Sequence, residues 1–117
     1  SKTFAPLEFA NLSDIRATEN VYAIGSPLDL SNTVTSGIIS MVSRPMWDND
    51  GMDTIMIQHT AGINPGNSGG ALVDIYGRLV GINTMAYVDD YVGEGINHLY
   101  FAVQIDQVKN TLNSLGY

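Results

Sequence analysis

The chain has 117 residues and a net charge of -7, from 5 Lys and Arg against 12 Asp and Glu, and it has no cysteine. This length suits one domain with a modest core, and 44% hydrophobic against 15% charged residues indicates a globular chain. The lack of cysteine excludes disulfides and thiolate metal sites. The few, scattered cations disfavour nucleic acid and anionic membrane surfaces as partners.

Residues 1–19 are expected to form a lead-in segment, and three strands are predicted after it. They cover residues 20–25 (NVYAIG), 32–44 (NTVTSGIISMVSR) and 53–60 (DTIMIQHT), which alternate or are rich in β-branched residues. Gly37, inside the second strand, predicts a bulge or sharp bend. In the third strand, Ile55, Ile57 and His59 share one face.

A hairpin is predicted next, in which residues 69–75 (GGALVDI) lead through the turn YGR to a strand over residues 78–87. Residues 98–104 (HLYFAVQ) indicate a further strand. The apolar period then changes to that of a helix, and Gly116 is interpreted as its stop, so a closing helix is predicted over residues 105–116. Its apolar face would comprise Ile105, Val108, Leu112 and Leu115. About six strands and one helix favour a single all-β domain over residues 1–117, either an antiparallel barrel or a sandwich.

The segment GNSGG, from Gly66 to Gly70, carries the main functional signal. Covalent acyl transfer needs an exposed hydroxyl beside fixed backbone N–H groups that stabilise an oxyanion. Glycines on both sides of Ser68 would let the backbone turn its N–H groups inward and let a substrate carbonyl approach without a clash. The structural alternative is a glycine-rich turn with an ordinary surface serine.

The surrounding sequence resembles the trypsin-like serine peptidases of the HtrA/DegP kind. The resemblance rests on IQHTAGINPGNSGGALVDIYGRLVGINTM, on AIGSPLDLSNTVTSGIIS before it and on YFAVQIDQVKNTL after it, and runs from about Val21 to Leu115. It implies a six-stranded antiparallel Greek-key barrel with a short C-terminal helix, the C-terminal half of a double barrel. It also implies a serine endopeptidase acting on protein substrates, and it suggests a location in the cell envelope or outside the cell.

Carried over by position, the resemblance implies that Ser68 is the nucleophile. The backbone N–H groups of Gly66 and Ser68, with Asn67 between them, would form the oxyanion hole. Three apolar residues would line the pocket for the substrate residue before the scissile bond: Ile63, Ile82 and Ala102. The backbone of a neighbouring strand would pair with an extended substrate at Asn83, Thr84 and Met85.

No cofactor and no metal are expected, because the acidic loop WDNDGMD lacks the acidic first and last ligands of a calcium loop.

A serine nucleophile needs a histidine base that a carboxylate orients. The chain has two histidines, His59 and His98. Neither has the family's context, in which the histidine and aspartate lie on an N-terminal barrel, so each is interpreted as a surface or strand-packing residue. Asp14 is not assigned as the triad acid. We therefore expect a C-terminal barrel without its N-terminal barrel, inactive alone, whose partners are a polypeptide substrate, the missing barrel of the same protein and a second copy of the chain.

A different class of function remains open at this point. A peptidase-like barrel can dock extended peptides by strand pairing without cutting them, or can serve as an assembly surface. The intact GNSGG segment favours the enzyme, because a pure binder would not need both the serine and its glycines.

Overall fold

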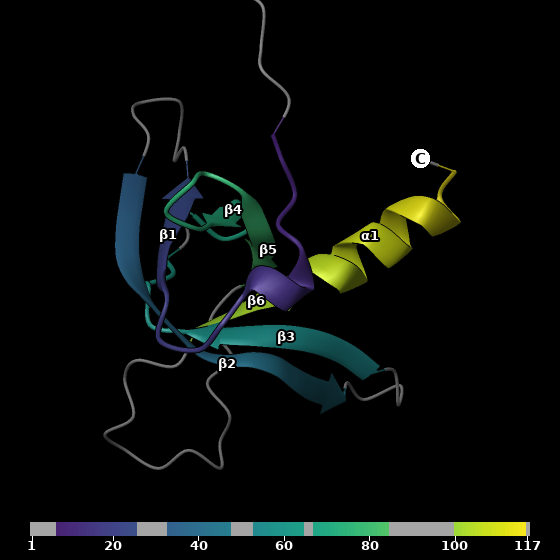
Figure 1. Cartoon of the computed structure of the whole chain (residues 1–117), viewed down its shortest axis with the longest axis horizontal. Helices are drawn as coiled ribbons and strands as arrows, with labels where there is room; N and C mark the ends of the chain where they lie inside the picture. Colours follow the sequence, from purple (N-terminus) through teal and green to yellow (C-terminus); the bar gives the residue numbers. More distant parts are fainter. Residues whose placement is uncertain (1–6, 26–32, 48–52, 65–66, 85–99, 117) are drawn as a thin grey trace, which may run out of the picture.

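A closed antiparallel barrel forms the body of the molecule, with strand order β1-β2-β3-β6-β5-β4 (Figure 1). The structure, a computed structural model, describes residues 7–25, 33–47, 53–64, 67–84 and 100–116. Because β4 returns to pair with β1 while β1, β2 and β3 are neighbours in sequence order, the connection is a Greek key. The predicted all-β barrel with a C-terminal helix is confirmed. Its elements are η1 (Leu12–Asp14), β1 (Asn20–Gly25), β2 (Thr33–Trp47), β3 (Asp53–His59), β4 (Ala71–Val73), β5 (Leu79–Asn83), β6 (Tyr100–Gln104) and α1 (Ile105–Ser114).

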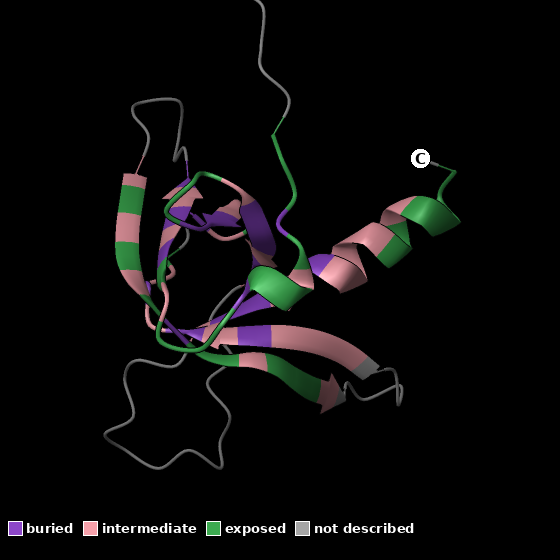
Figure 2. Cartoon of the chain, in the orientation of Figure 1, coloured by how far each residue is buried: buried purple, intermediate pink, exposed green. Residues whose placement is uncertain are grey.

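The strands form where the sequence alternates, because successive side chains point to opposite faces of a sheet. In β1, Val21 and Ala23 are buried, whereas Tyr22 and Ile24 are half-buried. Figure 2 shows the buried residues concentrated on the strands around the barrel interior. The core cluster consists of Ala10, Ile15, Val21, Ala23, Ile39, Ile57, Ala61, Leu72, Leu79, Val80, Ala102 and Ile105.

Of the two alternatives predicted for Gly37, the bulge is wrong, whereas the bend stays a prediction, because β2 passes from pairing with β1 to pairing with β3 between Ile38 and Ile39. The register of β2 against β3 shifts instead between Ile39 and Met41 and between Met41 and Arg44, while Gly37 stays paired with Val21 on β1. A Cβ atom at Gly37 would lie 2.3 Å from the backbone nitrogen of Ala61. Glycine is needed there because another backbone segment crosses close to the strand.

The predicted hairpin is confirmed as β4 and β5, joined by a turn that Asp74 closes. Its Oδ1 accepts the N–H groups of Tyr76 and Arg78, each at 2.9 Å, and its Oδ2 accepts Nε–H of Arg78 at 2.8 Å. Gly77 has φ +77°, which favours glycine. The second strand ends at Asn83, earlier than predicted, and residues 85–87 lie outside the described residues.

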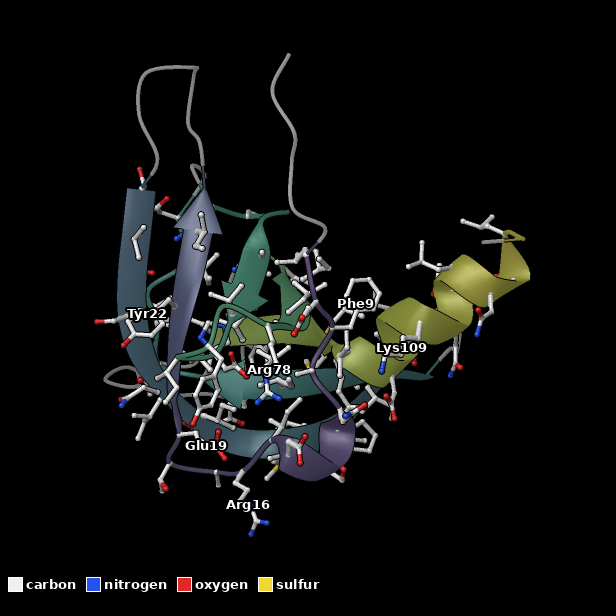
Figure 3. The ribbon with its side chains drawn as sticks, turned by 45° about the horizontal axis from the view of Figure 1, so that its top comes forward. Phe9, Arg16, Glu19, Tyr22, Arg78 and Lys109 are labelled. Atoms are coloured by element: carbon white, nitrogen blue, oxygen red, sulfur yellow. The ribbon has the colours of Figure 1, made fainter. Side chains whose placement is uncertain are left out.

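The lead-in segment joins the sheet beside β5. The N–H of Ala10 donates to the carbonyl of Leu79 at 2.9 Å, and the N–H of Leu79 donates to the carbonyl of Glu8 at 2.7 Å. β5 pairs with β6 only from Gly81 to Asn83, so the contact at Leu79 lies on the part of β5 that precedes this pairing. Figure 3 shows Phe9 of this segment next to α1, whose Lys109 ammonium lies 3.5 Å from the carbonyl oxygen of Ala10. The lead-in segment therefore lies beside the start of β5, at the end of the barrel where β6 ends and α1 begins.

The closing helix α1 ends at Ser114, two residues earlier than predicted. Ile105 is fully buried and Val108 packs against the core, but Leu115 is 68% exposed. Gly116 follows with φ +90°, in agreement with its predicted role as the helix stop. Leu112, also on the predicted apolar face, is half-buried, so burial of this face decreases from the start of the helix to its end. Within the described ranges, no helix combines the length and the apolar character that crossing a membrane requires.

Candidate active site

Ser68 lies half-buried in a tight turn that precedes β4. Gly69 has φ +85°, a conformation that side chains other than glycine adopt only with strain. A Cβ atom on Gly70 would lie 2.1 Å from the carbonyl oxygen of Ile24 on β1. The two glycines after Ser68 are therefore required by the backbone conformation and by close packing on the barrel wall.

Hydrogen bonds to β5 hold this turn in place. The N–H of Gly69 donates to the carbonyl of Asn83 at 2.8 Å, and the N–H of Asn83 donates to the carbonyl of Gly70 at 2.9 Å. The N–H of Thr84 donates to the carbonyl of Phe101 at 3.0 Å. These backbone groups, which the resemblance assigned to substrate pairing, are engaged inside the barrel, and Met85 lies outside the described residues.

The predicted oxyanion hole is only partly described, because Gly66 lies outside the described residues. The N–H of Ser68 donates to the carbonyl of Asn64 at 3.1 Å, as does the N–H of Asn67. The carbonyl of Asn64 thus occupies the Ser68 donor in this structure. A substrate oxyanion could bind that donor only after the Asn64 carbonyl had moved away.

The predicted pocket residues lie on three different segments. Ile63 is half-buried in the loop before Ser68 and packs against the core cluster. Ile82 is half-buried on β5 opposite Val103 of β6. Ala102 is fully buried on β6, so its side chain faces the barrel interior. Ile82, like Ile63, packs against the core cluster while remaining partly exposed.

His59 is buried in β3 as a strand-packing residue, which confirms that interpretation of this histidine. Its Nδ1 accepts the N–H of Ala61 at 3.1 Å, so the neutral ring carries its proton on Nε2. Nε2 and the Oδ1 of Asn83 are both buried without a hydrogen-bond partner among the described residues. Burial lowers the pKa of His59 to about 4, and the smaller effect of the Asn83 side chain opposes it. His59 therefore offers no accessible nitrogen as a base, and His98 lies outside the described residues.

Other ionisable groups near the barrel serve structural contacts. Asp14 lies 3.8 Å from Arg78 in an ion pair that ties η1 to the β4–β5 hairpin. Figure 3 shows Arg78 beside the lead-in segment. In the part of the chain that the structure describes, no group of three or more His, Cys, Asp or Glu residues is arranged to hold a metal ion.

The sequence pattern did not identify one polar contact of the Ser68 turn. The buried Asn67 side chain forms hydrogen bonds with the backbone of Gly62 and Asn64 in the loop before Ser68. The Oγ1 of Thr35 on β2, 32 residues away in sequence, lies 3.5 Å from Nδ2 of Asn67. The resemblance had placed Asn67 only between two backbone donors. No spacing rule could have found Thr35, because the contact depends on how β2 passes the loop.

The amino-acid sequence of the chain is similar to that of several known proteins. A family model described as trypsin-like peptidase domain matches residues 1–82. The chain is 40% identical to serine protease PepD of Mycobacterium tuberculosis, over 94% of the chain and 26% of the relative. It is 49% identical to serine protease Do-like HtrA of Bacillus subtilis, over 86% of the chain and 23% of the relative. It is 38% identical to periplasmic serine endoprotease DegP of Escherichia coli, over 97% of the chain and 23% of the relative.

These matches confirm the resemblance to trypsin-like peptidases of the HtrA/DegP kind. The chain spans about a quarter of the length of the curated relatives that it matches.

Proposed function

Because the chain belongs to the family of trypsin-like peptidase domains, we propose that Ser68 is the nucleophile of a serine endopeptidase that hydrolyses polypeptide substrates. The chain would be the C-terminal barrel of a two-barrel enzyme. It would contribute the nucleophile, the oxyanion hole and the specificity pocket, and it would be inactive alone.

The observation that carries this proposal is the construction of the Ser68 turn. Gly70 packs closely against β1, and both Gly69 and Gly70 form backbone hydrogen bonds with Asn83 of β5. The barrel wall therefore holds the serine. A nucleophile must be held in one geometry relative to the carbonyl that it attacks, because misplacement by about 1 Å can cost roughly 100-fold in rate. A turn that is fixed at both ends meets this requirement.

The proposed mechanism needs a base from outside this chain. In acyl transfer the serine hydroxyl attacks the carbonyl carbon while a histidine takes its proton and later returns it to the leaving amine. His59 cannot take this proton, because one ring nitrogen accepts a backbone N–H and the other is buried. We assign the base to an N-terminal barrel of the same protein.

The pocket suits small or medium aliphatic side chains. Ile63 and Ile82 are apolar, and neither is acidic, so a Lys or Arg side chain would find no countercharge from them. Cleavage after Val, Ala or Ile follows. One methylene changes such selectivity by only roughly 10- to 200-fold, so the preference would be loose.

A serine-directed organophosphonate tests this proposal on the longer protein that carries the chain. The probe should attach to Ser68, as located by mass spectrometry of the digested adduct, and Ser68→Ala should abolish labelling. Ser36→Ala, which removes an exposed serine of β2, is the matched control and should label normally. Labelling that persists in Ser68→Ala would refute the assignment of the nucleophile.

A second candidate function is a peptide-binding module that does not cut. The observation in its favour is that the Asn64 carbonyl occupies the N–H of Ser68. A correctly folded longer protein that binds extended peptides but neither hydrolyses them nor reacts with the probe would support this alternative.

A further inference from the structure

The side chain of Asn67 uses both ends of its amide inside the protein. It is fully buried, its Oδ1 accepts the N–H of Asn64 at 2.9 Å, and its Nδ2 donates to the carbonyl of Gly62 at 3.0 Å. These two partners are the residues on either side of Ile63. Asn67 is thus bonded to both neighbours of the proposed pocket wall.

Thr35 joins the same contact from the barrel wall. Its hydroxyl donates to the carbonyl of Gly62 at 2.7 Å and lies 3.5 Å from Nδ2 of Asn67, from which it accepts. Thr35 is paired with Ala23 of β1, so it stands on a regular part of the sheet. Further along β2, the N–H of Ile38 donates to Oγ1 of Thr60 at 2.9 Å and the carbonyl of Ile38 accepts the N–H of Thr60 at 3.0 Å, which holds the adjoining segment on the same strand.

The backbone of Asn67 extends this contact to the turn itself. Its N–H donates to the carbonyl of Asn64 and its carbonyl accepts the N–H of Gly70, each at 3.1 Å. One residue therefore bonds the loop before Ser68 through its side chain and the turn after Ser68 through its carbonyl. The nucleophile and Ile63 cannot shift independently while these bonds persist.

We propose that Asn67 and Thr35 are positioning residues, which hold Ser68 and the Ile63 pocket wall as one unit on β2. This role rests on the proposed function. The site needs a donor and an acceptor on one short planar side chain, which asparagine provides. In Asn67→Asp the ionised carboxylate has no donor and would face the carbonyl of Gly62, whereas the protonated acid regains one donor and keeps one acceptor.

The first experiment measures the contact without using activity. Amide hydrogen exchange is followed in the full chain for Thr35→Val, which removes the hydroxyl at nearly constant shape, and for Thr35→Ser, which keeps it. Thr33→Val, on the same strand, is the matched control. Exchange at Asn64 and Gly70 should rise roughly tenfold in Thr35→Val, the effect of losing about one internal hydrogen bond. Thr35→Ser and Thr33→Val should stay within about twofold of the unmodified chain.

The second experiment measures positioning in the longer, active protein. The rates of cleavage after Val and after Ala are compared for the same variants. Thr35→Val should lower kcat and bring the Val-to-Ala ratio closer to one, whereas Thr33→Val should leave both unchanged. In Asn67→Asp, activity relative to the unmodified protein should rise as the pH is lowered, because burial raises the pKa of the introduced carboxyl and its neutral form restores the donor.

The two experiments separate this proposal from the proposed function. Faster exchange in Thr35→Val with an unchanged Val-to-Ala ratio and kcat would overturn the positioning role. Unchanged exchange at Asn64 and Gly70 would overturn the contact itself. If the unmodified longer protein shows no cleavage at all, the proposed function fails, and the exchange measurement still decides whether Thr35 and Asn67 hold the turn.

Discussion

The protonation state of His59 is coupled to folding, because its ring is neutral and buried in the barrel. Its pKa falls from 6.5 to about 4 on folding. Between these two pH values the unfolded chain binds more protons than the folded chain, so the free energy of unfolding rises with pH through this window. The contribution of His59 to stability is complete above pH 6.5 and is lost as the pH falls toward 4. The difference corresponds to about 3 kcal/mol between pH 4 and pH 7.

Urea unfolding of the unmodified chain and of His59→Gln at several pH values measures this contribution. The free energy of unfolding should fall more steeply toward acid in the unmodified chain than in His59→Gln. Carboxylates contribute to acid destabilisation in both chains, so the difference between the two slopes isolates His59. Equal slopes would show that His59 does not titrate in the barrel with a lowered pKa.

The glycines near Ser68 differ in what they require. A Cβ atom on Gly70 would meet the backbone oxygen of Ile24 at 2.1 Å, whereas one on Gly62 would meet nothing within 4 Å. Gly70→Ala should therefore lower the free energy of unfolding by about 2 kcal/mol or more, and Gly62→Ala should change it by less than about 0.5 kcal/mol. Chemical unfolding of both variants checks this, and equal stability would contradict the close approach to Ile24.

At the scale of the elements, α1 contributes through its first turns. Val108 packs against the core, but Leu115 lies past the end of the helix and is 68% exposed. Val108→Asp should cost about 2 kcal/mol or more, because the carboxylate would lose water without gaining a partner. Leu115→Asp should be neutral within about 0.5 kcal/mol. Thermal unfolding distinguishes them, and comparable losses would mean that Leu115 also packs on the barrel.

The strands of the barrel could be predicted because each is a local pattern. Alternation in β1 and the shared face of Ile57 and His59 in β3 follow from a period of two residues. The register shifts of β2 and the reason for Gly37 could not be predicted, since both depend on which segment crosses the strand. The contact between Thr35 and Asn67 is of the same kind, because residues far apart in sequence meet only after the barrel closes.

At the scale of the molecule, the outer face of β2 carries apolar side chains. Val34 is 58% exposed, Ile38 is 39% exposed and Met41 is 43% exposed. An exposed apolar surface promotes association, so the isolated chain should dimerise at high concentration. Ile38→Lys should shift sedimentation toward monomer, whereas Ile75→Lys, at the exposed β4–β5 turn, should not. A monomeric unmodified chain at high concentration would contradict this expectation.

The proposed nucleophile, Ser68, needs a base that we assign to another barrel of the same protein. Hydrolysis of a peptide with Val before the scissile bond is measured for the 117-residue chain alone and after the preceding part of the protein is joined to it. In a related serine peptidase, loss of the base costs on the order of a millionfold in kcat. The chain alone should therefore show negligible hydrolysis, the joined protein should show restored hydrolysis, and joined Ser68→Ala should show none. Full activity of the chain alone, or undiminished activity of joined Ser68→Ala, would contradict this proposal.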